Sequence, residues 1–353
     1  MYDLPNFTIF LCVLPNKVPR TYRSYKYKRI YTFCGIMAIM SVEIVIQQMI
    51  IIFILIFVGV FLYKTKKIDE NVSTSLSWIV VNITNPLTLI TAALTSSIEL
   101  TLKHLFFAIG CFIVAYAILF LMSHIIPAIL RVPSDDRFSY RMLTLFSNVG
   151  FIGIPFVSAV LGNDALIYVS ICCLVFNLII YTYGINVMSE TGRKCNPESN
   201  VSTACFSVKK LFNFGTVSSL LTILIYALHL RLPEMVSTTT DLMGRCTTFL
   251  SMLVLGTSLA RIKPVILFTK WRLYIFTVLR FVLIPIGIAV LAKFFITDKM
   301  LLQVLIIEMS LPCANMPLML AKEYKTSEET ISCGIILTTL LSIITLPIVV
   351  LFL

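Results

Sequence analysis

The sequence has few of the charged side chains that soluble proteins carry on their surfaces. Of its 353 residues 13% are charged, whereas 58% are hydrophobic, and the mean hydropathy is +0.96. No soluble domain could bury so much apolar surface, so the composition is typical of a polytopic membrane protein. A helix needs roughly 20 residues to cross a hydrocarbon core about 30 Å thick. We therefore expect an all-α membrane protein with ten transmembrane helices.

The sequence also lacks the short motifs of the common enzyme and metal-binding classes. It contains no CxxC, HExxH or GxSxG motif, and its three histidines are scattered. Those motifs would indicate a zinc or redox site, a metalloprotease or a serine hydrolase. Half of the ten cysteines lie in apolar runs, where cysteine behaves as a small hydrophobic residue. We expect no enzymatic activity, no metal and no cofactor.

Features of two other classes of membrane protein are absent as well. No stretch repeats the filter sequence that a channel needs. No long polar segment could form the signalling domain of a receptor. These absences favour a transporter. The alternative is a channel, or a receptor or sensor for a small organic ligand.

Acidic residues are scarce, with 17 Asp and Glu against 28 Lys and Arg and a formal net charge of +11. The basic residues lie in short loops between apolar runs, a pattern that orients membrane proteins rather than one that binds nucleic acid. The loops after the odd-numbered apolar segments carry about two to four Lys or Arg each, and the others carry none to two. By the positive-inside rule the odd-numbered loops are cytoplasmic, in a multi-pass protein of the cell (plasma) membrane.

A polar connector, residues 189–212, divides the chain into two halves. Residues 40–188 and residues 213–353 each contain five apolar segments. An odd number of spans in each half requires the two halves to lie inverted in the membrane. Residues 1–39 are basic and lie on the wrong side for this orientation. They are either an extension upstream of a native start at Met40, which we favour, or a segment that distorts the topology.

One apolar stretch in the second half contains two prolines that should break a helix. Residues 305–324 read LIIEMSLPCANMPLMLAKEY, in which Asn315 lies between Pro312 and Pro317. Proline lacks a backbone donor and clashes with the carbonyl four residues earlier. Unpaired backbone at membrane depth is tolerated only where protein or a water-filled cavity satisfies it. The alternative is a kinked helix without a ligand.

A corresponding stretch lies in the first half. Residues 146–162 read FSNVGFIGIPFVSAVLG and contain Asn148, Gly150 and Pro155. Interrupted helices at corresponding positions of two halves mark the substrate site of many transporters. In the second apolar segment, the pair Asn85-Pro86 predicts a further break.

Each broken helix should present a free N-terminus to a ligand. Such an end carries free N–H groups and the positive end of the helix dipole, so it favours a carboxylate. Asn148 and Asn315 can donate amide N–H groups without the desolvation cost of a buried charge. The alternative for each asparagine is a hydrogen bond between helices. The predicted substrate site consists of Asn148, Gly150, Pro155, Pro312, Asn315 and Pro317.

Two ionisable residues lie within apolar runs, where such groups are functional candidates. Glu308 lies about one helical turn before Pro312 and could bind a coupling proton or sodium ion. The alternative is an interfacial carboxylate paired with a neighbour. Arg280 could neutralise the substrate or the charge of Glu308, and the alternative is packing near the membrane interface.

Four motifs, taken together, resemble the auxin efflux carrier family. They are NVGFIGIPFVSAVLG, LVLGTSLARIKP, LRFVLIP and LPCANMPLMLAKEY, in the order of the family's fourth, seventh, eighth and ninth spans. The resemblance covers about residues 40–353 and indicates a bacterial-type permease related to the plant auxin efflux carriers. The Asn-Pro pair that often opens the family's sixth span reads Asn213-Phe214 here, so the entry into that helix is expected to differ.

This resemblance implies a fold like that of the sodium/bile-acid symporters, with two inverted five-helix repeats whose fourth and ninth helices are broken and cross. Spans 1, 2, 6 and 7 would form a scaffold that pairs in a homodimer. The remaining spans would form a transport domain that moves in an elevator-type mechanism. The implied substrate is a small organic anion such as a carboxylate, with a proton or sodium ion as coupling partner and the lipid bilayer as surroundings.

The predicted orientation is testable with an impermeant thiol reagent in intact cells. An Asn163→Cys variant should react, and Cys195 in the connector should not, because the lysine and arginine asymmetry places them outside and inside. Labelling of Cys195 but not of the new cysteine would reverse the assignment.

Overall fold

Helices make up the regular secondary structure of the described residues, which are 43–96, 101–195, 213–228, 230, 233–261 and 270–351 of the computed structural model. No strand occurs among them, so the all-α prediction is confirmed. The predicted extension, residues 1–39, and residues 196–212 of the predicted connector lie outside the described residues.

Seven helices within the described ranges are long and apolar enough to cross a membrane, which indicates an integral membrane protein. They are Glu43–Lys64, Glu70–Thr95, Leu102–Ile129, Asn163–Arg193, Glu234–Ala260, Trp271–Ala292 and Glu329–Val350. The other three predicted spans are shorter or interrupted. Phe214–Ala227 is a short apolar helix, and the predicted fourth and ninth spans are each split in two.

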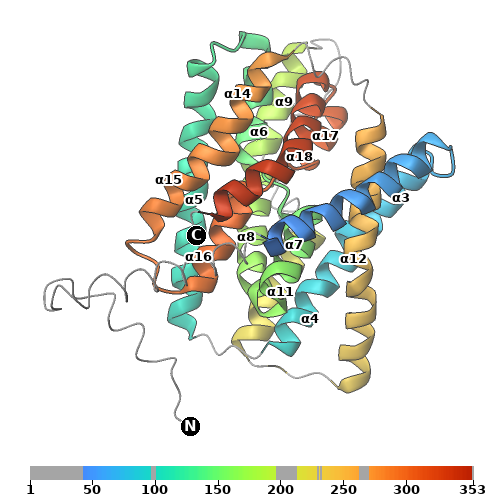
Figure 1. Cartoon of the computed structure of the whole chain (residues 1–353), viewed down its shortest axis with the longest axis vertical. Coiled ribbons are helices and arrows are strands. Elements are labelled where there is room, and N and C mark those ends of the chain that lie inside the picture. Colours follow the sequence, from blue (N-terminus) through green and yellow to red (C-terminus); the bar gives the residue numbers. More distant parts are fainter. Residues whose placement is uncertain are drawn as a thin grey trace, which may run out of the picture. The chain divides into compact units, whose positions relative to one another are not determined.

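The elements of the two halves of the chain follow one another as shown in Figure 1. After Glu43–Lys64 come α3 (Glu70–Ile79), η1 (Val80–Thr84), α4 (Asn85–Thr95), α5 (Leu102–Ile129), α6 (Arg137–Leu145), η3 (Val149–Gly153), α7 (Ile154–Leu161), η4 (Asn163–Ala165), α8 (Leu166–Ile179), η5 (Ile180–Gly184) and α9 (Ile185–Cys195). The second half contains α11 (Phe214–Ala227), α12 (Glu234–Ala260), α14 (Trp271–Val278), η6 (Leu279–Leu283), α15 (Ile284–Ala292), α16 (Lys299–Ser310), α17 (Met316–Glu323) and α18 (Glu329–Val350). The helix α9 runs to Cys195, into the predicted connector.

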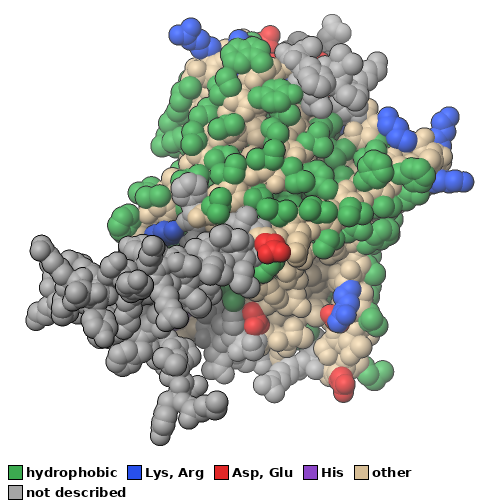
Figure 2. Space-filling model, in the orientation of Figure 1, with side chains coloured by type: hydrophobic (Ala, Val, Ile, Leu, Met, Phe, Trp, Pro, Cys, Tyr) green, Lys and Arg blue, Asp and Glu red, His purple; other side chains and the backbone are tan. Residues whose placement is uncertain are grey.

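Much of the molecular surface is apolar. Hydrophobic side chains cover most of the upper part of the face shown in Figure 2, over α14, α18 and the helix Glu43–Lys64. Phe57 on that helix is 68% exposed and Ile344 on α18 is 57% exposed. Water would not favour such a surface, whereas lipid chains would solvate it.

Three prolines within helices follow a widened turn instead of breaking the chain. Pro86, Pro155 and Pro285 each lie in the first turn of a helix that continues a π-helical turn. In the first case the Asn85 N–H bonds to the Val80 carbonyl, five residues back. The wider turn moves the carbonyl that the proline ring would otherwise meet. The predicted break at Asn85-Pro86 is therefore wrong, and Pro155 does not open the fourth segment either.

The two predicted broken stretches do unwind. The break in the second stretch contains Pro312, whereas the break in the first stretch lies before Pro155. Helix α6 ends at Leu145 and η3 begins at Val149, while α16 ends at Ser310 and α17 begins at Met316. The two unwound segments cross and pair with each other in an antiparallel bridge between Ser147 and Cys313. We call residues 146–148 and 311–315 together the crossover.

Backbone hydrogen bonds across the crossover satisfy much of its unwound chain. The Asn148 N–H donates to the Pro312 carbonyl at 2.8 Å, and the Ala314 N–H donates to the Phe146 carbonyl at 3.0 Å. The Cys313 N–H donates to the Thr338 hydroxyl of α18 at 3.1 Å. Each broken segment therefore supplies part of the partners that the other needs in an apolar surrounding.

Arg280, in η6, contacts the ends of both half-helices that lead into the crossover. Its Nε donates to the Thr144 carbonyl in the last turn of α6, and its Nη1 donates to the Met309 carbonyl in the last turn of α16 at 2.7 Å. Its Nη2 donates to the Ser147 hydroxyl at 2.8 Å. Helix C-termini carry free carbonyls and partial negative charge, so a buried guanidinium satisfies both.

We expect Arg280→Met to destabilise the protein by about 2–4 kcal/mol, because it leaves three buried acceptors without their charged donor. Arg280→Lys should cost less but still be measurable, since a lysine offers a point charge rather than a fork of donors. The unfolding midpoint of the purified protein in detergent measures both effects.

The matched control is Arg272→Met on α14, because Arg272 is partly exposed and rests beside the Trp271 ring. That change should lower the midpoint much less. An Arg280→Met protein as stable as the parent would contradict this role for the guanidinium.

Candidate functional site

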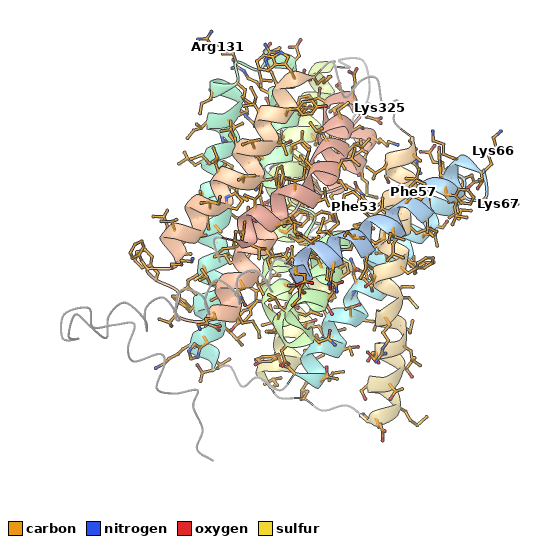
Figure 3. All side chains as sticks on the ribbon, in the orientation of Figure 1. Phe53, Phe57, Lys66, Lys67, Arg131 and Lys325 are labelled. Atoms are coloured by element: carbon orange, nitrogen blue, oxygen red, sulfur yellow. The ribbon has the colours of Figure 1, made fainter. Side chains whose placement is uncertain are left out.

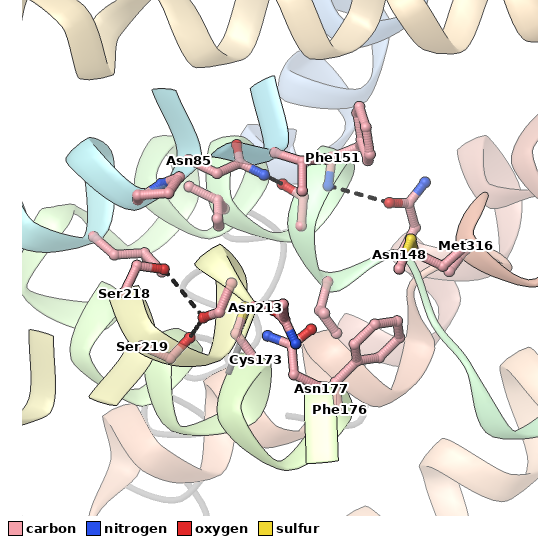
Figure 4. Close-up of a pocket in the computed structure, with 18 of the residues that line it drawn as sticks. Asn85, Asn148, Phe151, Cys173, Phe176, Asn177, Asn213, Ser218, Ser219 and Met316 are labelled. Atoms are coloured by element: carbon pink, nitrogen blue, oxygen red, sulfur yellow. Dashed lines mark hydrogen bonds between the residues drawn. The ribbon is translucent and has the colours of Figure 1, made fainter. Parts of the chain in front are cut away.

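A cavity lies beside the crossover, between α4, α8 and α11 (Figure 4). It encloses about 670 Å³ with its open side included. Its polar lining consists mainly of amide and hydroxyl side chains, and none of the described residues that line it is charged. Five asparagines line this crossover cavity: Asn85, Asn148, Asn177, Asn213 and Asn315.

Asn148 lies at the start of η3 and is 2% exposed. Its Oδ1 accepts from the Phe151 N–H at 3.1 Å, which caps the helical segment that follows. Its Nδ2 has no hydrogen-bond partner among the described residues. The cap fixes the amide, so a buried amide donor remains available at the cavity.

Asn315 precedes α17 and is 7% exposed. Its backbone carbonyl accepts from the Leu318 and Met319 N–H groups, whereas its Oδ1 has no partner in the described part of the chain. The two ends of an asparagine amide are assigned from the hydrogen-bond network, so this site offers either a donor or an acceptor to a ligand.

Asn85 is a cavity residue that the sequence pattern marked only as a helix break. Its Nδ2 donates to the Gly150 carbonyl at 3.3 Å, and its Oδ1 is buried without a partner among the described residues. A Cβ on Gly150 would lie 3.4 Å from that Nδ2, in ordinary van der Waals contact with it. The signal in the sequence was the Asn-Pro pair itself.

The opposite wall of the cavity comes from the start of α11. Asn213 caps this helix, because its Oδ1 accepts from the Thr216 N–H at 3.0 Å. A Cβ on Gly215 would lie 2.9 Å from Asn177 Nδ2, so a larger residue there would require the Asn177 side chain to move. Asn177 was not among the predicted site residues, and Asn213 was predicted only as a departure from a motif. The usable signal was an asparagine within an apolar run.

The predicted prolines do not line the crossover cavity. Pro312 contributes its carbonyl to the Asn148 N–H, and Pro317 lies in the first turn of α17. Pro155 lines a different cavity, between α4, α7 and α12. Of the six residues predicted for the substrate site, the cavity brings together Asn148, Gly150 and Asn315.

Glu308 lies in α16, fully buried behind the crossover rather than in its cavity. A Cβ on Gly153 would lie 2.8 Å from both carboxyl oxygens, so the side chain packs directly against the backbone of η3. Neither oxygen has a hydrogen-bond partner among the described residues. Arg280 bonds to carbonyls and to Ser147 instead, so the predicted pairing of Arg280 with Glu308 is not formed.

Comparison with known proteins identifies one family. The model of the family described as "Membrane transport protein" matches residues 44–350, nearly the whole described part of the chain. A comparison with curated proteins gives no match. The matched segment contains both broken stretches, the crossover cavity and Arg280. The chain therefore belongs to the membrane transport protein family, which is the auxin efflux carrier family that its motifs predicted.

Proposed function

We propose that this membrane transport protein is a secondary transporter that moves a small organic anion, a carboxylate, across the cell membrane. The observation that carries the proposal is the uncharged cavity where two broken helices begin again, with unpartnered amide groups of Asn148 and Asn315 in its wall. Transporters of several folds bind their substrates at such interrupted helices.

The electrostatics of the crossover favour an anion. The starts of η3–α7 and of α17 carry the positive ends of their helix dipoles, and the cavity has no acidic lining residue among those described. The C-terminal ends of α6 and α16, which carry the negative ends, bond to Arg280 instead. A carboxylate would therefore meet donors and favourable dipoles without a fixed counter-charge.

We further propose ten transmembrane segments in two inverted repeats. The basic residues Lys66, Lys67, Arg131 and Lys325 come from loops after the first, third and ninth predicted spans, and all lie in the upper half of the view in Figure 3. This arrangement supports a cytoplasmic location for the odd-numbered loops. It also supports an odd number of spans in each repeat.

An elevator-type movement is the proposed mechanism. Helix α4 packs against α11 and α12, while α5 packs against α6 and α8. The crossover cavity lies at the seam between these two groups. Movement of the second group along the first would carry the bound anion from one side to the other, with the first group as the scaffold of a homodimer.

Asn148→Leu and Asn315→Leu should each weaken carboxylate binding roughly 10- to 150-fold, because each removes one hydrogen bond to a charged ligand. The proteins should fold, since asparagine contacts in membranes contribute little to stability on average. Binding and uptake of a panel of labelled carboxylates by purified protein in liposomes measure the effect.

Asn82→Leu is the matched control, because the Asn82 amide bonds only to the Trp78 carbonyl of its own helix among the bonds described. Its affinity should stay within about two-fold of the parent. Unchanged affinity in both crossover variants, with normal expression, would place the substrate elsewhere.

Glu308 is the proposed site of the coupling ion. A buried carboxylate without a partner is costly, so this group should carry a proton or a cation when the crossover is closed over it. Glu308→Gln is always neutral and should make uptake insensitive to an imposed pH or sodium gradient while substrate affinity is retained. Glu323→Gln, an exposed position on α17, should keep the gradient dependence. A gradient response equal to that of the parent would exclude Glu308 as the coupling site.

A further inference from the structure

A second polar cavity lies between α4, α7 and α12, on the side of the crossover where the α7–α8 turn is found. We call it the α7 cavity, and it encloses about 580 Å³ with its open side included. It shares one lining residue, Ile154, with the crossover cavity. Ile154 is 1% exposed, so a buried apolar side chain lies between the two spaces.

The α7 cavity contains a hydroxyl without a partner. Thr91 of α4 is 5% exposed, and its Oγ1 has no hydrogen-bond partner among the described residues. Thr88, one turn earlier, differs because its hydroxyl lies 2.8 Å from the Thr247 hydroxyl and 3.0 Å from the Gly244 carbonyl. A buried hydroxyl normally finds a partner, so the Thr91 hydroxyl indicates a ligand or water in this space.

A charged pair lies at the wall that α12 provides. Arg245 donates from Nε to Asp241 Oδ2 at 2.8 Å, and its Nη2 lies 2.8 Å from the same oxygen. A guanidinium carries five N–H groups, so this contact leaves donors for a second carboxylate. The Arg245 side chain is 75% exposed, so the rest of the protein does not enclose its guanidinium.

We propose that the α7 cavity is a second binding site for the carboxylate substrate, in which Thr91 and Arg245 hold it on the Asn163 side of the crossover. This inference rests on the proposed transport function. Asn85 and Thr91 are six residues apart on α4, roughly 9 Å along the helix axis. Asn85 bonds to Gly150 of η3, directly after the crossover, in the present conformation. Thr91 would be its counterpart when the crossover and α7 have moved together along α4 toward the Asn163 side.

A chemical test needs no knowledge of the substrate. Thr248 lines the α7 cavity one turn from Arg245, so a Thr248→Cys variant places a thiol beside the guanidinium. The exposed Cys246 is first replaced by serine. The rate at which an anionic reagent, 2-sulfonatoethyl methanethiosulfonate, modifies this thiol is divided by the rate at which neutral N-ethylmaleimide modifies it. Arg245→Gln should lower this ratio about five-fold, and Asp241→Asn should raise it by a similar factor.

Two charge-matched controls separate a local effect from the general surface potential. Lys299→Gln removes a positive charge at the exposed start of α16, and Glu234→Gln removes a negative charge at the exposed start of α12. Neither residue lines the α7 cavity. Both controls should leave the ratio within about two-fold. Equal changes in controls and cavity variants, or no change in either, would overturn the proposal of an anion site.

A transport test links the site to the substrate. Thr91→Val removes the hydroxyl at nearly constant volume, and Thr95→Val is the control on the exposed continuation of the same helix. In oriented membrane vesicles, Thr91→Val should raise the half-saturating carboxylate concentration about ten-fold from the Asn163 side and less than two-fold from the other side. Asp241→Asn should lower the half-saturating carboxylate concentration and Arg245→Gln should raise it, in both cases from the Asn163 side alone.

The outcomes separate this inference from the proposed function. If Asn148→Leu impairs transport and the cavity variants behave as their controls do, the second site is wrong and the crossover site stands. If the cavity variants show the side-specific changes and both asparagine variants transport normally, the crossover site is wrong instead. Absence of carboxylate uptake by the parent protein would overturn both.

Discussion

The structure depends on satisfying the backbone of two broken helices inside an apolar surrounding. Hydrocarbon offers no hydrogen-bond partners, so every unwound residue must find one within the protein. The crossover does this in two ways. Its two segments bond to each other through Asn148 and Pro312 and through Ala314 and Phe146. Arg280 bonds to the carbonyl ends of the two incoming half-helices.

This arrangement separates the two kinds of helix end. The ends with free carbonyls meet a fixed cation, Arg280, which is fully buried. The ends with free N–H groups face a cavity whose described lining contains amide and hydroxyl groups but no charged side chain. In the proposed function, amides and helix dipoles would attract the anion without an ion pair. Release matters as much as binding in a transporter.

Close helix approach at a few glycines shapes the group formed by α4, α12 and Glu43–Lys64. A Cβ on Gly256 would lie 2.1 Å from the Ile56 carbonyl, and one on Gly244 would lie 3.1 Å from the Thr88 Cα. Helix α12 can therefore lie directly against Glu43–Lys64 and α4. Small and hydroxyl-bearing residues along such a contact allow helices to pack closely in membranes. In the proposed mechanism, α4 presents polar groups at two depths, Asn85 and Thr91.

The amino-acid sequence by itself determined the membrane class, the family, the helical fold and the two stretches that unwind. These features follow from apolar run length, proline chemistry and motif order, all of which are local. The tertiary structure alone decided how each proline acts. Pro86 and Pro155 follow π-helical turns because a neighbouring carbonyl can shift by one residue, whereas Pro312 lies in an unwound segment whose backbone is paired by residues 146–148. The tertiary structure also decided that Arg280 bonds to carbonyls rather than to Glu308. It placed Asn85, Asn177 and Asn213 in the lining of the crossover cavity. Those outcomes depend on contacts between residues far apart in the chain, which periodicity and composition do not encode.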